Sequence, residues 1–375
     1  MTTLAELYRI DNFIDTFALG HYARVLDAVD QRTGQTIAFK VLRSEHLSQN
    51  GDIRWEYRAF SSEADLLIKL ANSPSIVKLR DCGYLSTHSE APAGGDIQSF
   101  GLNISAFKEH TPDFAERDWR PYLTLENLPR NNNLLYLMKP SQQNTRWRLP
   151  TEEGLALALQ FAQFLQMAHR QNIVYLDHKL EHVYWDGSRL QIIDLNSSRQ
   201  LENGVKTGDS QFFRMDVHNL CVGILYPIFT GLSPQKTTLR PQPSSQLEVE
   251  RRYQDITALD FGVEPSLSQS IQDLLQRGAA MQIETIDEFL DELRRVAAQQ
   301  GWDFPAQYTS PPSRDARDQM RAGLRKLREG QDAIRTARDL FREAIIQDGI
   351  PADMEEELRR LVKAANEMFN HRVIP

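Results

Sequence analysis

The chain has 375 residues, of which 41% are apolar and 25% charged, enough for one large or two ordinary hydrophobic cores. Its formal net charge of -8 argues against a general nucleic-acid-binding protein. Only Cys82 and Cys221 are present, too few for a disulfide framework or a cysteine metal site. No signal-peptide pattern opens the chain and no apolar run is long enough to span a membrane, so we expect a cytoplasmic protein.

The first part of the chain is rich in strand patterns. Residues 25–29 and 36–42 are β-prone runs joined by Thr33-Gly34, which predicts a hairpin turn. Apolar residues at helical spacing follow, and Pro74 ends that pattern. Two further strand patterns, 76–85 and 121–128, complete a small sheet with one helix.

Residues 86–120, between those two strands, mix turn formers and charged residues with little periodicity. This pattern predicts a long loop or an insert.

Helical patterns dominate from residue 151 onward. Residues 151–171 predict an amphipathic helix, and residues 216–231 predict a buried helix closed by Gly231. Two further amphipathic helices are predicted at 266–278 and 285–300. After the breaker cluster at 310–313, the pattern predicts three helical stretches, at 313–329, 331–347 and 352–369.

Several short motifs follow one another between residue 10 and about residue 300. They are IAFK, SSEADLL, YLTLENLP, YLDHKLEHVYW, IIDLN and DVHNLCVGILYPIFTG. Eight of their polar residues, in chain order, are Lys40, Glu63, Glu126, Asp177, Lys179, His182, Asp194 and Asp216. In this order and near this spacing, the motifs resemble those of the eukaryotic-like protein kinase family, as a divergent member or a pseudokinase.

The resemblance implies an ATP site. Lys40 would hold the α- and β-phosphates and pair with Glu63, while Leu125 would be the gatekeeper beside the adenine-binding hinge. The implied nucleotide-binding residues are Ala18, Gly20, Val25, Ala38, Lys40, Glu63, Leu125, Glu126 and Leu128.

The resemblance also implies the chemistry of phosphoryl transfer. Asp177 would be the catalytic base, Lys179 would steady the transferring phosphate, and Asp194 would carry Mg or Mn. Asp216 would open a buried helix and accept backbone hydrogen bonds from the segment around Tyr175 and Leu176.

Two departures from the family pattern affect the ATP and metal sites. The glycine-rich loop has alanine at Ala18 and Ala23, whose methyl groups reduce the approach of backbone to phosphates. His182 replaces the family's metal-binding asparagine, and imidazole is a poorer magnesium ligand than an amide oxygen. A zinc site from His178, His182 and Asp194 is conceivable, but a packed or solvated histidine is the simpler interpretation.

Other departures affect regulation. Leu176 replaces the arginine that receives an activation-loop phosphate in the family, and no APE motif precedes Asp216. Gln282 stands where the arginine partner of that motif would be, so both halves of the ion pair are absent. We therefore expect no phosphorylation-switched activation.

The resemblance implies an α+β, bilobal kinase-like fold, with a small antiparallel sheet lobe at 1–125, a larger helical lobe at 126–309 and a helical extension at 310–375. The leading functional hypothesis is a bacterial-type serine/threonine kinase that transfers the γ-phosphoryl group of ATP to a protein. The alternatives are a pseudokinase that acts as a scaffold or signalling module and, more weakly, a small-molecule kinase. The extension is either a helical cap or a partner-binding module. Residues 335–349 resemble one tetratricopeptide helix, which is too little to indicate a repeat array.

Overall fold

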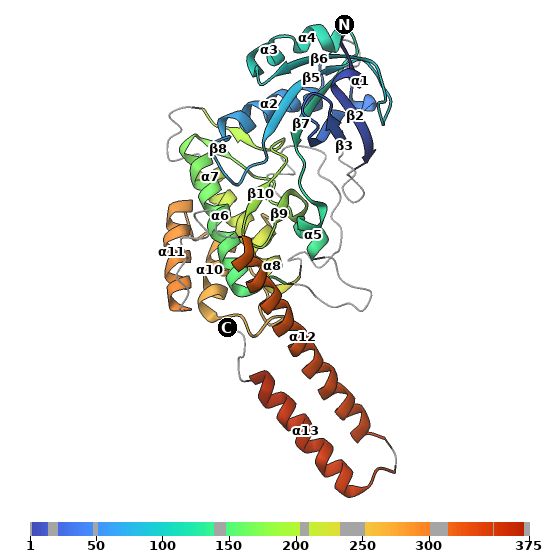
Figure 1. Cartoon of the computed structure of the whole chain (residues 1–375). Coiled ribbons are helices and arrows are strands. Elements are labelled where there is room, and N and C mark those ends of the chain that lie inside the picture. Colours follow the sequence, from blue (N-terminus) through green and yellow to red (C-terminus); the bar gives the residue numbers. More distant parts are fainter. Residues whose placement is uncertain are drawn as a thin grey trace.

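The computed structural model describes residues 2–13, 22–47, 52–138, 148–202, 210–232, 252–300, 314–347 and 349–370. The chain is an α+β protein, with a curled antiparallel sheet in its N-terminal part and a helical C-terminal region (Figure 1). No helix among these residues is long and apolar enough to cross a membrane.

The sheet has seven strands in the order β1-β6-β5-β7-β4-β3-β2. These strands are β1 (Thr2–Thr3), β2 (Tyr8–Phe13), β3 (Ala23–Asp30), β4 (Thr36–Leu42), β5 (Leu79–Leu85), β6 (Asp96–Gly101) and β7 (Arg120–Glu126). The predicted hairpin turn joins β3 to β4, and Gly34 takes a φ of 70°, which glycine adopts without steric cost.

The short α1 (Leu4–Leu7) contacts β1 and β2, and η1 (Ser44–His46) lies near the following helix, where His46 contacts Glu56. This helix, α2 (Trp55–Lys69), lies against the sheet. Its apolar face, including Phe60 and Leu67, is buried, as the helical spacing of its sequence predicts.

The prediction of a long loop at 86–120 is wrong, because this segment contains β6, α3 (Ile104–Glu109) and α4 (Thr111–Glu116). Local signals explain the helices: the Asn103 side chain caps α3 and Pro112 lies in the first turn of α4. Each helix is too short for an amphipathic period to be recognised in the sequence. Phe107 of α3 is fully buried, and the helix packs against α2.

The helical region is built around α6 (Thr151–Arg170), most of whose residues are buried. Its other helices are α5 (Leu134–Leu137), α7 (Ser210–Asn219), the π-helical η5 (Leu220–Leu225), α8 (Tyr226–Thr230), α10 (Gln269–Ala279) and α11 (Ile286–Gln299), with the short 3-10 segments η2 (Arg130–Asn132) and η3 (Leu180–His182). Two strand pairs complete it, β8 (Ile173–Val174) with β11 (Arg199–Gln200) and β9 (Val183–Trp185) with β10 (Leu190–Ile192).

The predicted buried helix at 216–231 is present as part of α7, η5 and α8 in direct succession, but α7 begins at Ser210 rather than at Asp216. Gly231 closes the helix with a φ of 74°. A π-helical turn in its middle was not predicted.

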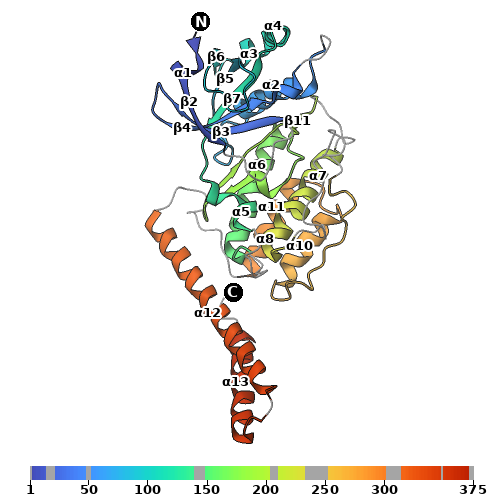
Figure 2. The ribbon, with the colours of Figure 1, turned by 90° about the vertical axis from the view of Figure 1, so that its right-hand side faces the viewer.

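Beyond residue 313, α12 (Arg314–Ile345) and α13 (Ala352–Asn370) form a helical hairpin that extends away from the rest of the molecule (Figures 1 and 2). The prediction of a break at Gly330 is wrong, because α12 is continuous through it. A glycine inside a helix costs only about 1 kcal/mol, which the surrounding helix-favouring residues and the packing on α13 offset. The predicted break before residue 352 is confirmed, because α12 ends at Ile345 and α13 begins at Ala352.

Candidate active site

Three charged side chains meet where the sheet approaches the helical region. Lys40 comes from β4, Glu63 from α2, and Asp194 from the segment after β10. The Lys40 Nζ lies 2.8 Å from Glu63 Oε2 and 3.3 Å from Asp194 Oδ1. The predicted Lys40–Glu63 ion pair is therefore confirmed. Through Asp194, Lys40 also links the sheet to the helical region.

Burial shapes the electrostatics of this triad, since Lys40 is 5% and Glu63 1% exposed. Burial alone would lower the pKa of Lys40, but the negative charges of Asp194 and Glu63 outweigh it and raise that pKa. Burial likewise tends to raise the pKa of Asp194, yet the charge of Lys40 holds it well below its ordinary value. Burial raises the pKa of Glu63, although the charge of Lys40 opposes this shift. Lys40 thus remains a cation between Glu63 and Asp194.

The apolar residues expected to contact a nucleotide lie on β3, β4 and β7 or directly after β7. Val25 pairs with Lys40 across β3 and β4, and Ala38 pairs with Leu125 across β4 and β7. Leu128, just after β7, is buried and belongs to the same hydrophobic cluster as Ala38 and Leu125. Glu126 is half-buried at the end of β7. Ala18 and Gly20 lie outside the described residues.

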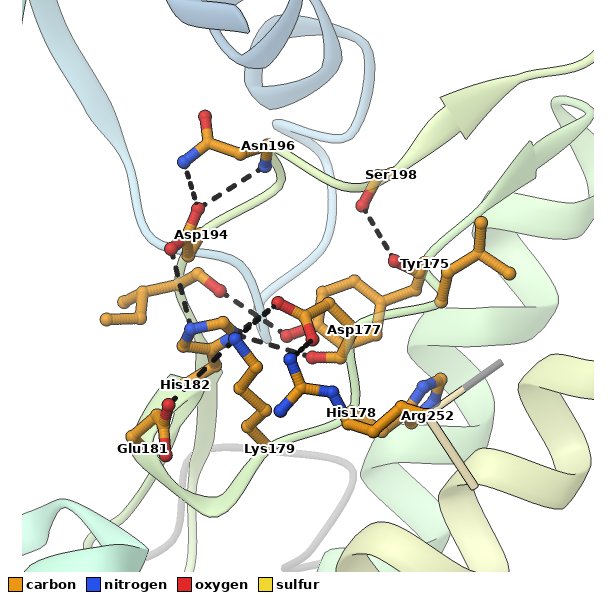
Figure 3. A network of polar contacts seen from close by, with 12 residues as sticks. Tyr175, Asp177, His178, Lys179, Glu181, His182, Asp194, Asn196, Ser198 and Arg252 are labelled. Carbon is orange, nitrogen blue, oxygen red and sulfur yellow. Dashed lines mark hydrogen bonds and ion pairs between the residues drawn. The ribbon is translucent and has the colours of Figure 1, made fainter. Parts of the chain in front are cut away.

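The loop between β8 and β9 carries Asp177 and Lys179, whose side chains form an ion pair with 2.9 Å between Nζ and Oδ2 (Figure 3). On the other carboxylate oxygen, Arg252 Nη2 lies 3.3 Å from Asp177 Oδ1. Burial would raise the pKa of Asp177, but neighbouring cations, led by Lys179, hold it below its ordinary value. Asp177 is therefore a carboxylate between two cations.

His182 lies between the carboxylates of the loop and of Asp194. Its Nε2 is 3.4 Å from Asp194 Oδ2, and its Nδ1 is 3.3 Å from the carbonyl oxygen of Asp177. Within the described ranges, no three His, Cys, Asp or Glu side chains are arranged to hold a metal ion.

His178 faces away from His182. Its ring is fully buried and stacks on Phe161, with 5.3 Å between ring centroids. Burial lowers the pKa of His178 to about 4, so the ring is neutral at pH 7. The zinc site that the sequence made conceivable is not assembled by these three residues.

The prediction that Asp216 opens the buried helix is wrong, because α7 begins at Ser210 and Asp216 lies inside it. The Asp216 side chain is fully buried and supports the loop. Its carboxylate accepts hydrogen bonds from the backbone N–H groups of Tyr175 and Leu176, at 2.8 and 2.7 Å. The predicted bracing role is confirmed. The support is needed because Leu176 has a φ of 65°, which is costly for a side chain of its size. Asn219 adds a hydrogen bond of 3.0 Å to the Leu176 carbonyl.

Sequence reasoning missed Arg252 and Tyr253. They follow a stretch without a recognisable motif and lie 75 positions after the loop that they contact. The Tyr253 hydroxyl donates a hydrogen bond of 2.8 Å to the His178 carbonyl. No local pattern signals such contacts, because only the folded chain brings these residues together.

Comparison with known proteins found no family model that matches this chain and no curated protein sequence that matches it.

Proposed function

We propose that the chain has a kinase-like bilobal fold and transfers the γ-phosphoryl group of ATP to a protein hydroxyl. The observation that carries this proposal is the buried contact of Lys40 with both Glu63 and Asp194. In phosphoryl transfer, a lysine fixed by a helix glutamate is needed to hold the nucleotide phosphates, and an aspartate close by is needed for the metal.

The helix 216–231 gives a second line of support. Its sequence, DVHNLCVGILYPIFTG, is one residue longer than the kinase pattern DxWSLGxxLYELLTG that it resembles. The π-helical turn Leu220–Leu225 accommodates an extra residue within a continuous helix. The insertion is thus compatible with the resemblance.

One divalent ion fits the residues present. Mg²⁺ usually binds one or two carboxylates together with substrate phosphates, and Asp194 is the carboxylate that would hold it. Bound there, the ion would neutralise charge on the phosphates. A second ion does not fit, because His182 offers an imidazole nitrogen where a hard oxygen ligand is needed.

The protein residues supply the remaining steps. Lys40 positions the nucleotide phosphates, and Glu63 keeps the lysine in place. Lys179 stabilises the negative charge of the group in transfer, 2.9 Å from the carboxylate of Asp177. Asp177 orients the attacking hydroxyl and accepts its proton. Leu176 is buried with Val174 and Leu201. It carries no positive charge, so it cannot bind an activating phosphate.

A binding module without catalysis is the second candidate, and a specific observation favours it. Asp177 is held by Lys179 and Arg252, and these charges depress its pKa and weaken it as a base. In this case the site would bind nucleotide, and the protein would act through contacts with a partner.

Titration of ATP followed by transfer of labelled γ-phosphate separates the two candidates. We expect ATP binding in the presence of Mg²⁺ or Mn²⁺ to be lost in Lys40→Met. The matched control is Lys69→Met, which removes a half-exposed lysine of α2. Transfer should disappear in Asp177→Asn while binding persists. Binding without transfer in the wild-type chain would establish the second candidate, and absence of binding would refute both.

His182 gives this proposal a metal-specific test. His182→Asn should increase Mg²⁺-dependent transfer, because it restores an oxygen ligand, and Mn²⁺ should be the better ion for the wild-type chain. Equal activity of the two proteins with both ions would show that His182 does not touch the metal.

A further inference from the structure

Tyr22 has a buried hydroxyl group that makes no hydrogen bond within the part of the chain that the structure describes. The residue directly precedes β3, and its backbone carbonyl accepts a hydrogen bond of 2.8 Å from the Arg43 N–H. A buried donor without an acceptor destabilises a protein. A bound molecule that offers an acceptor at this place would remove that penalty.

Aromatic contacts fix the position of the Tyr22 ring. It meets Trp55 and Phe60 of α2 edge-on, with 5.4 and 6.3 Å between ring centroids, and the His46 ring at 6.4 Å. The hydroxyl is therefore held in place by the fold. A hydrogen bond from it to a ligand would require little additional ordering of the side chain.

The contact with Phe60 brings Tyr22 close to the Lys40–Glu63 ion pair. Glu63 follows Phe60 by three positions on α2, so both side chains lie on the same side of that helix. Lys40 shares a face of β4 with Leu42, because every second side chain of a strand points the same way. Leu42 and Phe60 belong to one core cluster, and Tyr22 packs against it. Tyr22 thus lies on the face of the sheet that carries the candidate active site.

The charges around the hydroxyl indicate the same place. Burial raises the pKa of Tyr22 well above its ordinary value, and the negative charges of Asp194, Glu63 and Asp177 raise it further. The hydroxyl therefore keeps its proton and is a neutral donor at pH 7. In the proposed function, the γ-phosphate lies between the ion held by Asp194 and the acceptor hydroxyl oriented by Asp177, where both carboxylates act on it.

We propose that the Tyr22 hydroxyl donates a hydrogen bond to an oxygen of the γ-phosphate of ATP, which makes Tyr22 a further nucleotide-binding residue. This inference deepens the proposed transferase function and rests on it. The sequence supplies a separate reason, because Ala18 and Ala23 reduce the approach of the loop backbone to the phosphates. A side-chain donor compensates for that loss, and a charged phosphate oxygen is a strong acceptor.

Tyr22→Phe tests the hydrogen bond, because this substitution removes the hydroxyl and leaves the ring. ATP and ADP are each titrated, with excess Mg²⁺, into the wild-type chain, Tyr22→Phe and the control Tyr57→Phe. Tyr57 is a buried tyrosine of α2 whose hydroxyl donates a hydrogen bond of 2.8 Å to the Trp119 carbonyl. Thermal unfolding of the three proteins is measured without nucleotide.

We expect Tyr22→Phe to weaken ATP binding about tenfold or more, the lower range for a hydrogen bond to a charged group, while ADP binding changes less than about twofold. Tyr57→Phe should bind both nucleotides as the wild-type chain does. Without nucleotide, Tyr22→Phe should melt at the wild-type temperature or above it, because only an unpaired donor is removed. Tyr57→Phe should melt at a lower temperature, because a paired hydroxyl is lost.

Equal ATP affinity of the wild-type chain and Tyr22→Phe overturns the proposed hydrogen bond, and so does an equal loss of affinity for ATP and ADP. A lower melting temperature of nucleotide-free Tyr22→Phe also overturns it, because the hydroxyl would then have a partner in the free protein. If the wild-type chain binds neither nucleotide, the proposed function fails as well. That result is distinct from the others, in which the wild-type chain binds ATP and Lys40→Met does not.

Discussion

At the scale of single residues, His178 is a buried polar side chain that lacks hydrogen-bond partners. Neither ring nitrogen has a hydrogen-bond partner among the described residues, and the nearest carboxylate oxygen, of Asp216, is 4.0 Å from Nδ1. The imidazole therefore stays neutral in the folded chain.

Acid should destabilise the protein through His178. Its pKa of about 4 in the folded chain is below the ordinary 6.5, so the unfolded chain binds the proton first as the pH falls. The contribution of neutral His178 to the free energy of unfolding is fully present above pH 6.5 and is lost between pH 6.5 and about 4. It amounts to about 3 kcal/mol at most, since one pKa unit corresponds to 1.36 kcal/mol.

Urea unfolding of the wild-type chain and of His178→Leu over this pH range measures the effect. We expect His178→Leu to be at least as stable at pH 7 and to lose less stability toward pH 4. His110→Leu, at an exposed histidine, is the control and should follow the wild-type profile. If the stability of all three proteins fell equally with pH, the acid destabilisation would not come from His178.

At the scale of elements, the π-helical turn η5 is held by the glycine at its centre. A Cβ on Gly223 would lie 2.7 Å from the Tyr253 ring and 2.8 Å from the His178 carbonyl oxygen. The carbonyl belongs to the backbone and cannot rotate away. Gly223→Ala should therefore lower the free energy of unfolding by about 1–3 kcal/mol.

Gly323→Ala is the matched substitution in α12, where nothing lies within 4 Å of the added Cβ. It should increase helix stability by up to about 1 kcal/mol. Circular dichroism during thermal unfolding can follow both variants. The prediction fails if the two substitutions change the free energy of unfolding in the same direction.

The sequence predicts some elements well and others poorly, for physical reasons. The Lys40–Glu63 pair was predictable because each residue lies in a regular element recognisable from its motif. Helices α3 and α4 were not, because six residues are too few to show a helical period. Gly330 was overinterpreted, since a glycine weakens a helix without ending it when no left-handed turn follows. The position of Arg252 depends on tertiary packing alone.

At the scale of the whole molecule, we expect the α12–α13 hairpin to contribute little to the stability of the rest of the chain. The two helices pack mainly on each other, and both views show them extending outward (Figures 1 and 2). Truncation after residue 300 should therefore change the free energy of unfolding by no more than about 0.5 kcal/mol, as for a surface change. ATP binding should be unaffected.

Truncation after residue 284 is the contrasting control. It also removes α11, whose Phe289, Leu290 and Leu293 are buried in the main core, and should prevent folding. Urea unfolding and ATP titration check both truncated chains. Loss of stability on removal of the hairpin alone would show that it belongs to the core.

The hydrogen bonds of Asp216 also make the loop and the helix 216–231 one unit in amide hydrogen exchange. The N–H groups of Tyr175 and Leu176 bond to a side chain of that helix rather than to their own strand. They can exchange with deuterated water only when the loop separates from Asp216 of α7. Their protection should therefore match that of the core of α7, and Asp216→Asn should accelerate exchange at both amides far more than in α11. Fast exchange at these amides in the wild-type chain would mean that the strained peptide of Leu176 relaxes in solution.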